Sequence, residues 1–247
     1  MTVFLCGNSQ LAALAEGVAE GRDPAAGPAG GAVVDGELTI FPLGNGKHEP
    51  TAFSRLTPEG VVFEPRQYAA NLQRYAGRTA IAPGDTWGFL TINHNVRIYR
   101  DPMWKTYVPS ALDLPGTPVT DDLLATIVAR DHAGVRGLFA QLQEAGVDFF
   151  AVSAPHPRQD GTAVRNGVPR PVIAYLDALS RSLWRSWLGE RGIGLVEPPP
   201  STVTPDGFLD AAYGAGPDSD GRLDPHHANA AYGALMLARV REFLTTR

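Results

Sequence analysis

The chain holds an aspartate and a histidine at a spacing that suits acid–base chemistry. Asp224 and His227 lie three residues apart in RLDPHHANAAYGALML (222–237), just before a helical pattern. Side chains at this spacing can meet within about one helical turn. A carboxylate on one imidazole nitrogen fixes the tautomer and leaves the other nitrogen free to accept a proton from a hydroxyl. The spacing therefore predicts that His227 is a general base oriented by Asp224. It favours His227 over the adjacent His226.

A serine that such a base could activate stands far away in the sequence. Ser9 belongs to GNSQ (7–10), which follows a short apolar run and precedes a helix-like stretch. A serine hydroxyl needs an adjacent base to act as a nucleophile at neutral pH. The carboxyl end of a parallel strand is where α/β proteins bind ligands, and the N–H groups of the next helix can stabilise an oxyanion. We therefore predict that Ser9 is the nucleophile, with a helix N-cap as the alternative.

Cys6 is the rival nucleophile. It is the single cysteine of the chain, so no intrachain disulfide can form. It lies inside the first apolar run, and cysteines buried in apolar surroundings are usually inert. The pattern therefore favours Ser9.

Five short apolar stretches would have to position these residues. They lack the polar alternation of a half-exposed sheet, which is typical of strands buried on both faces of a parallel sheet. The predicted strands are 2–6, 38–42, 87–92, 148–152 and 194–196. Helical patterns occupy 9–19, 121–145 (broken near 132–134), 172–191 and 228–244.

Strands that alternate with helices imply right-handed crossovers. We therefore predict a single α/β domain, 1–247, with three α/β/α layers and a five-stranded parallel sheet in flavodoxin-like order. Two loops, 21–36 and 197–222, are longer than average, and loops of this length are usually functional or mobile. The second one leads to Asp224 and His227.

The composition argues against several partners. The net charge is −5, so the chain has no basic excess to displace the counterions of a nucleic acid. No apolar run approaches the ~20 residues of a transmembrane helix, and the N-terminus lacks the basic region of a signal peptide. We therefore expect a cytoplasmic protein with no nucleic-acid or membrane partner.

The sequence also lacks the patterns of the common cofactor sites. His48 and His132 show no metal-ligand spacing, and no HExxH, CxxC or complete GxGxxG occurs. We therefore predict no metal and no cofactor. Without a Gly-x-Ser-x-Gly, an α/β-hydrolase nucleophile elbow is excluded.

Taken together, the two ends of the sequence resemble the SGNH/GDSL hydrolase superfamily. GNSQ resembles its Gly-Asp-Ser block after the first strand. DPHHAN resembles its Asp-x-x-His block before the last helix, including Asn229 two residues past the histidine. The resemblance covers nearly the whole chain in order. It implies a serine esterase whose catalytic triad is Ser9, His227 and Asp224.

The same resemblance implies two groups that bind an oxyanion. The second block of the superfamily supplies a glycine N–H after the next strand. In FPLGNGKHEP, Gly44 matches best, with Gly46 as the alternative. The third block supplies an asparagine side chain. In GFLTINHNVRIYRD, Asn93 stands nearer the strand end, with Asn95 as the alternative.

Two features depart from the pattern of the superfamily. Asn8 stands where an aspartate is usual, and the third block lacks Gly-x-Asn-Asp. GNSQ also resembles the Gly-Asn-Cys-Gln opening of a capsule-polysaccharide biosynthesis family with a related fold. The aspartate that Asn8 replaces is not the acid of the triad, so the departure concerns the subfamily more than the triad.

Basic and aromatic residues follow the third predicted strand. The stretch HNVRIYRDPMWKTY (94–107) suits either an anionic or sugar-bearing substrate or a solvated loop whose aromatic rings enter the core. We name Asn95 and Arg97 as substrate-binding candidates. His156, in SAPHPRQD after the fourth strand, is the third.

The sequence therefore predicts a serine hydrolase that cleaves an acyl or acetyl ester of a carbohydrate or small metabolite through an acyl-enzyme. Two alternatives stay open. One is an acyltransferase that uses the same triad in polysaccharide or metabolite biosynthesis. The other is a non-catalytic carbohydrate-binding or scaffolding domain of the same fold.

Overall fold

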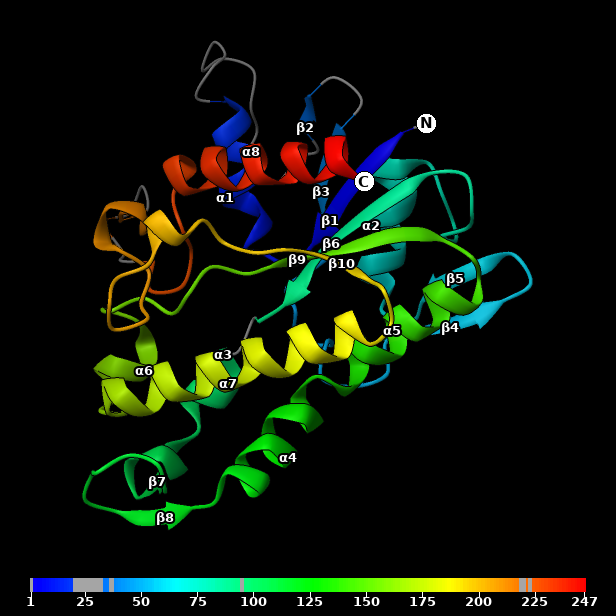
Figure 1. Ribbon diagram of the computed structural model, residues 1–247. Coiled ribbons are helices and arrows are strands. Elements are labelled where there is room, and N and C mark those ends of the chain that lie inside the picture. The colour runs from blue at the N-terminus through cyan, green and yellow to red at the C-terminus, as the bar shows by residue number, and fades with distance from the viewer. Residues whose placement is uncertain (1, 20–32, 36–37, 94–95, 218–220, 222–223) are drawn as a thin grey trace.

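A central six-stranded sheet organises the molecule, with strand order β10-β9-β6-β1-β3-β2 (Figure 1). The computed structural model describes residues 2–19, 33–35, 38–93, 96–217, 221 and 224–247. The five parallel strands are β1 (Val3–Gly7), β3 (Leu38–Pro42), β6 (Thr86–Ile92), β9 (Asp148–Ser153) and β10 (Gly194–Val196). Their order along the sheet is the 2-1-3-4-5 of flavodoxin-like folds, so the predicted five-stranded parallel sheet is confirmed.

Several short strands were not predicted. β2 (Val33–Asp35) adds an antiparallel edge beside β3. A hairpin joins β4 (Ser54–Thr57) to β5 (Gly60–Phe63), and β7 (Tyr107–Pro109) pairs with β8 (Thr117–Val119). Each of these strands is three or four residues long, which is too short for apolar periodicity to identify.

Helices cover both faces of the central sheet, as the apolar strands require. All residues of β1 and β6 are buried. One face carries α1 (Leu11–Ala19) and α8 (Ala230–Thr246). The other face carries α2 (Arg66–Ala76), α5 (Ala133–Glu144) and α7 (Arg170–Gly189). The predicted three-layer architecture is therefore present.

The predicted helices have boundaries close to the observed ones, but α2 and the two short helices Val96–Arg100 and Thr162–Arg165 were not predicted. The predicted break near 132–134 is present, because α4 (Asp121–Asp131) ends one residue before the buried His132. Helix α2 was missed because it is polar and buries only Tyr68 and Leu72. No helix among the described residues is both long and apolar enough to cross a bilayer.

A third apolar cluster joins α4 and α7 to two short helices, α3 (Val96–Arg100) and α6 (Thr162–Arg165). Trp104 is fully buried in it and donates its indole N–H to Ile98 O at 2.8 Å. Tyr99 is buried in the same cluster, whereas Arg100 beside it is exposed. Two aromatic rings of the stretch 94–107, those of Tyr99 and Trp104, therefore lie in the core, whereas Arg100 and Tyr107 are exposed.

Helices α1 and α8 pack against each other at a crossing that requires glycine. A Cβ atom on Gly233 would lie 1.7 Å from the carbonyl oxygen of Ala13. Helix α1 begins two residues after Ser9, and α8 begins three residues after His227. The crossing therefore sets how the two ends of the predicted site approach each other.

The two long loops differ in how much the structure describes. Most of 21–36 lies outside the described residues. The described part of 197–222 contains two 3-10 helices, Pro200–Thr202 and Ala211–Tyr213. A β-bridge between Gly214 and Ala228 ties this loop to the segment that carries His227.

Candidate active site

Ser9 lies in the turn between β1 and α1, at the carboxyl end of the sheet. Its neighbour Asn8 provides the side-chain cap of this turn, because Asn8 Oδ1 accepts the N–H of Gln10 at 3.1 Å. Ser9 O accepts the N–H of Ala12 at 3.2 Å and so belongs to the first turn of α1. The half-buried Ser9 side chain stands between this turn and the first residue of α1, Leu11.

The carboxylate of Asp224 holds the His227 ring and the backbone around it. Asp224 Oδ2 lies 2.6 Å from His227 Nδ1. Its other oxygen accepts the backbone N–H groups of His226 and His227 at 3.0 and 3.1 Å. Burial alone would raise the pKa of Asp224, but these hydrogen bonds outweigh it and lower the pKa below its ordinary value. An ionised Asp224 keeps the proton of His227 on Nδ1.

The opposite nitrogen of His227 is available to a reacting group. His227 Nε2 is buried and has no hydrogen-bond partner among the described residues, Ser9 included. A buried polar atom without a partner is uncommon and requires an explanation, and a catalytic role is one of those that apply. Hydrogen bonds between a nucleophile and its base are often long without substrate and tighten when substrate binds.

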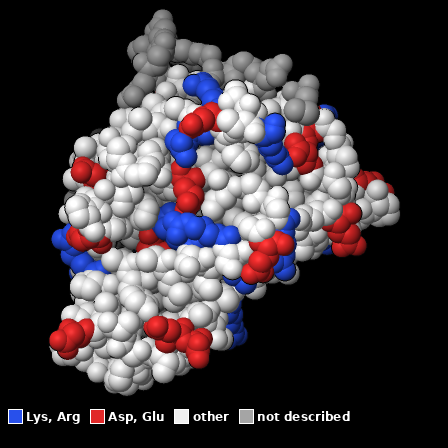
Figure 2. All heavy atoms as spheres, in the orientation of Figure 1, with Lys and Arg blue, Asp and Glu red and all other residues white. Residues whose placement is uncertain are grey.

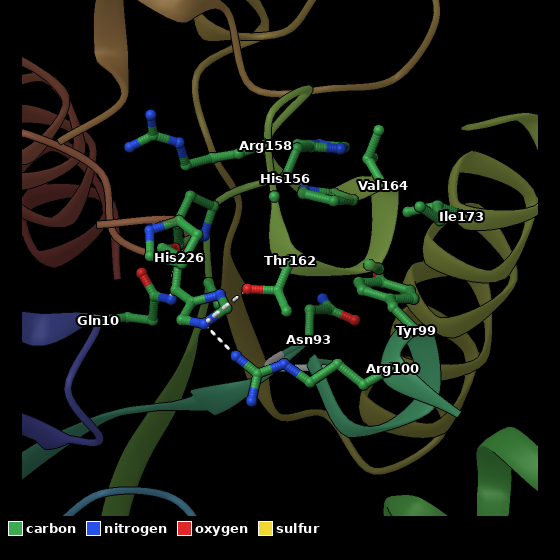
Figure 3. Close-up of a pocket in the computed structure, with 16 residues that line it drawn as sticks. Gln10, Asn93, Tyr99, Arg100, His156, Arg158, Thr162, Val164, Ile173 and His226 are labelled. Atoms are coloured by element: carbon green, nitrogen blue, oxygen red, sulfur yellow. Dashed lines mark hydrogen bonds between the residues drawn. The ribbon is translucent and has the colours of Figure 1, made fainter. Parts of the chain in front are cut away.

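His226 has a different environment. Its Nε2 contacts an Arg100 guanidinium N–H and lies 3.3 Å from Thr162 Oγ1 (Figure 3). Burial and the positive charge of Arg100 lower the pKa of His226 to about 4. Asp224 binds only the backbone N–H of His226 and not its ring. The carboxylate thus orients His227, the histidine that the spacing favours.

Hydrogen bonds link the two ends of the predicted site. Gln10 Nε2 donates to His226 O at 3.0 Å, which ties the Ser9 turn to the histidine segment. Arg158 donates to His227 O at 3.2 Å and to Ala215 O at 2.6 Å, which fixes the histidine segment from the other side.

Asn93 sits at the end of β6 and is held on both sides. Its backbone has φ 60, the left-handed region that is uncommon outside glycine but tolerated by asparagine. Asn93 Nδ2 donates to Ser153 Oγ at 2.8 Å, and Oδ1 accepts from Ser180 Oγ at 3.0 Å. One N–H of the amide is therefore bonded to Ser153, and no partner of the other is found in the part of the chain that the structure describes. Asn95 lies outside the described residues.

A buried polar network behind Asn93 was missed by the sequence prediction. Arg181 donates to Ser153 Oγ at 2.8 Å and to Asp177 Oδ2 at 2.7 Å. Asp177 also accepts from Tyr99 Oη at 2.7 Å. Burial would raise the pKa of Asp177, but the charge of Arg181 dominates and lowers the pKa to about 2. The i, i+4 spacing of Asp177 and Arg181 was the only sequence signal for this pair, and it is also typical of an exposed helix face.

The glycines after β3 differ in what their N–H groups do. Gly44 N lies 3.5 Å from Gly7 O, at the end of β1 and beside the Ser9 turn. Gly46 donates its N–H to Tyr68 Oη at 3.2 Å. The N–H of Gly44 therefore makes a longer hydrogen bond than the N–H of Gly46. Gly44 is also closer in sequence to the end of β3. A Cβ on Gly44 would lie 2.0 Å from the Tyr68 ring, so only glycine fits there.

Asn8, the departure from the usual aspartate, binds a buried acid. Asn8 Nδ2 lies 3.2 and 3.3 Å from the two carboxyl oxygens of Glu49. Burial raises the pKa of Glu49 well above its ordinary value, and the Asn8 hydrogen bond opposes this shift. An aspartate at position 8 would face the Glu49 carboxyl group directly, whereas the asparagine amide donates to it and avoids repulsion between two carboxylates.

The structure places only one of the predicted substrate-binding side chains, that of His156. His156 lines a pocket at the carboxyl edge of the sheet, and its Nδ1 lies 2.9 Å from Asp177 Oδ2. The backbone of Arg97 belongs to α3, but its side chain lies outside what the structure describes. Among the described residues, no group of three or more His, Cys, Asp or Glu is placed to hold a metal ion.

The pocket is adjacent to the predicted triad. Its lining includes Gln10, next to Ser9, and His226, next to His227, with Asn93 and Arg100 at its side (Figure 3). The triad residues themselves are not part of the lining. The pocket therefore lies beside the predicted triad and does not contain it. On the face shown in Figure 2, charged side chains occur in small mixed groups rather than in one basic patch.

Comparisons with known proteins identify the fold. No protein-family model and no curated protein sequence matches the chain. A GDSL-like lipase from Bacteroides thetaiotaomicron aligns over 99% of this chain and 88% of its own, with a TM-score of 0.51 and 8% identity. A carbohydrate acetylesterase family member from Sinorhizobium meliloti aligns over 100% and 98%, with a TM-score of 0.48 and 15% identity. The chain therefore shares the fold of the GDSL-like lipase, which is the fold that the sequence blocks predicted.

Proposed function

We propose that the protein is a serine hydrolase of the SGNH/GDSL class that cleaves a carboxylic ester. The observation that carries the proposal is the contact between Asp224 and His227 at 2.6 Å, with the far nitrogen of His227 buried and unpartnered among the described residues. This arrangement occurs at the carboxyl edge of the sheet, beside the turn that holds Ser9. The shared fold with a GDSL-like lipase supports the same reading.

The proposed reaction is acyl transfer through Ser9. His227 Nε2 removes the proton of the Ser9 hydroxyl while Ser9 Oγ attacks the ester carbonyl carbon. The tetrahedral intermediate places a negative charge on the carbonyl oxygen, which the N–H groups of Ser9 and Gly44 and the free amide N–H of Asn93 bind. His227 then protonates the leaving alcohol, and the acyl group remains on Ser9. Water, activated by His227, hydrolyses the acyl-enzyme.

The buried network gives Asn93 its proposed role as an oxyanion donor. Ser153 and Ser180 hold the amide at both ends, and Arg181 in turn holds Ser153. A donor fixed before the reaction stabilises developing charge without reorganising, which makes the electrostatic contribution large.

Hydrolysis of 4-nitrophenyl acetate tests the proposal. Ser9→Ala should lower kcat by at least about 10³-fold, because the nucleophile is lost. Ser201→Ala, which removes an exposed hydroxyl in a 3-10 helix away from the site, is the matched control and should keep wild-type kcat. Wild-type turnover in Ser9→Ala, at an unchanged melting temperature, would refute the assignment.

A further inference from the structure

The described lining of the pocket beside the proposed triad combines arginines with neutral polar side chains and lacks an acid. Its described lining contains Arg100, His156, His226 and Thr162, but no aspartate or glutamate. Asp177, which contacts the lining residue His156, is already bound by Arg181, His156 and Tyr99. The chain as a whole is acidic, with a net charge of −5. The acid-free lining of this pocket therefore differs from the acidic composition of the chain as a whole.

Arg100 is the arginine of the lining whose charge is directed at the pocket. The other arginine in the lining, Arg158, is paired with Asp160 through two hydrogen bonds of 2.8 and 2.9 Å. Figure 3 shows the Arg158 guanidinium pointing away from the pocket. Arg100 instead extends along the pocket to His226 and has no carboxylate partner among the described residues.

The hydrogen-bond partner of Arg100 among the described residues, His226, is neutral. His226 Nε2 accepts from the guanidinium, which requires an uncharged ring. Burial and the charge of Arg100 lower the pKa of His226 to about 4, so the ring stays neutral at pH 7. A guanidinium carries five N–H donors. Most of them remain for a ligand, and a planar anion matches their geometry best.

The size and the place of the pocket restrict the ligand. Its cavity volume of about 50 Å³ is several times the roughly 10–15 Å³ that one water molecule needs. The space suits a group of a few heavy atoms, such as a carboxylate. Gln10 and His226 each adjoin a residue of the proposed triad, so a group bound here would belong to the molecule whose ester is cleaved.

We propose that Arg100, with Thr162 and the neutral His226 beside it, makes this pocket a recognition site for a carboxylate carried by the ester substrate. The inference rests on the proposed ester hydrolysis and names its substrate class. The carboxylate takes no part in the chemical step. It binds the guanidinium and so places the ester carbonyl beside Ser9, which lowers KM and raises kcat/KM for anionic esters.

The test compares esters that differ only in charge. 4-Acetoxybenzoate and 3-acetoxybenzoate are matched with their neutral amides, 4-acetoxybenzamide and 3-acetoxybenzamide. For at least one pair, the wild type should prefer the carboxylate in kcat/KM by about 10-fold or more, as one charge-assisted hydrogen bond allows. Arg100→Gln should remove most of this preference, mainly through KM. Arg66→Gln, at an exposed arginine of α2, should preserve it.

A binding measurement separates failure of this inference from failure of the proposed function. Benzoate and benzamide are titrated into wild type, Arg100→Gln and Arg66→Gln by calorimetry. Benzoate should bind wild type and Arg66→Gln more tightly than benzamide does, and this difference should vanish in Arg100→Gln. Ser9-dependent hydrolysis with no charge preference in either pair would overturn the carboxylate site alone. Arg100-dependent binding of benzoate without any hydrolysis would overturn the proposed function and leave the anion site standing.

Discussion

At the scale of single residues, the account depends on how Asp224 sets the tautomer of His227. One carboxyl oxygen binds two backbone N–H groups, and the other binds the ring. Asparagine at this position keeps a carbonyl oxygen for the backbone but turns an NH₂ group toward Nδ1. Nδ1 must then accept, so the proton moves to Nε2 and His227 can no longer act as a base.

Asp224→Asn should therefore lower kcat/KM by about 10³-fold or more, with a melting temperature close to that of the wild type. The measurement is hydrolysis of 4-nitrophenyl acetate from pH 6 to pH 9, with thermal unfolding in parallel. Rates equal to wild type across this range would show that Asp224 does not orient the base.

The contacts of the residues next to Ser9 differ in how far the sequence could predict them. The distance in sequence between GNSQ and DPHHAN hides the fact that Gln10 binds His226 O. The residue types and the order of the blocks predicted a common site. The contact between Asn8 and Glu49 was not predictable, because both residues are polar and only the fold shows that both are buried.

At the scale of elements, the crossing of α1 and α8 holds the two ends of the site together. Gly233 lets the α8 backbone reach Ala13 O, where a Cβ atom would lie at 1.7 Å. The contact is with main-chain atoms, which cannot rotate away as a flexible side chain would. A larger residue must push the two helices apart.

Gly233→Val should therefore destabilise the fold by about 1–3 kcal/mol or more and reduce esterase activity in the remaining folded protein. Gly137→Ala in α5 is the control, because nothing lies within 4 Å of the Cβ it adds. Alanine there should be neutral or stabilise the helix by up to about 1 kcal/mol. Urea unfolding measures both, and equal stability of Gly233→Val and wild type would show that the crossing is not tight.

The elements predicted well are those with a strong apolar signal. β3 and β10 have the predicted boundaries, β1 is shifted by one residue at both ends, and β6 and β9 are each one residue longer than predicted. Helix α7 was predicted from its apolar positions, yet its polar residues Asp177 and Arg181 are buried. Whether such a pair faces solvent or the core depends on how the helix lies on the sheet, which periodicity does not specify.

At the scale of the whole molecule, buried histidines couple stability to pH. His132 is nearly fully buried and accepts from Arg136 at Nδ1 while its Nε2 bonds to Ser180 Oγ. Burial and the charge of Arg136 lower the pKa of His132 from 6.5 to about 3. Between these pH values, the unfolded chain binds a proton at this position that the folded protein does not. Stability is therefore highest above about pH 6.5 and falls as the pH decreases.

The expected loss from His132 is about 1.4 kcal/mol per pH unit below pH 6.5, or about 2 kcal/mol at pH 5. Lowering the pH from 7.5 to 5.0 should reduce the free energy of unfolding of His132→Gln by less than that of the wild type. This holds whatever the stability of the variant at pH 7.5. The measurement is the free energy of unfolding in urea at both pH values. His48→Gln is the control and should keep the wild-type loss. The same pH dependence in His132→Gln and wild type would contradict the assignment.

The most direct test of the central claim is covalent labelling of Ser9 by a fluorophosphonate. The probe reacts with a serine whose hydroxyl is activated by a nearby base, and it does not require knowledge of the substrate. Wild-type protein should be labelled, peptide mapping should place the label on Ser9, and Ser9→Ala should remain unlabelled. Absence of labelling in the wild type, or equal labelling of Ser9→Ala, would contradict the account of this protein as a serine hydrolase.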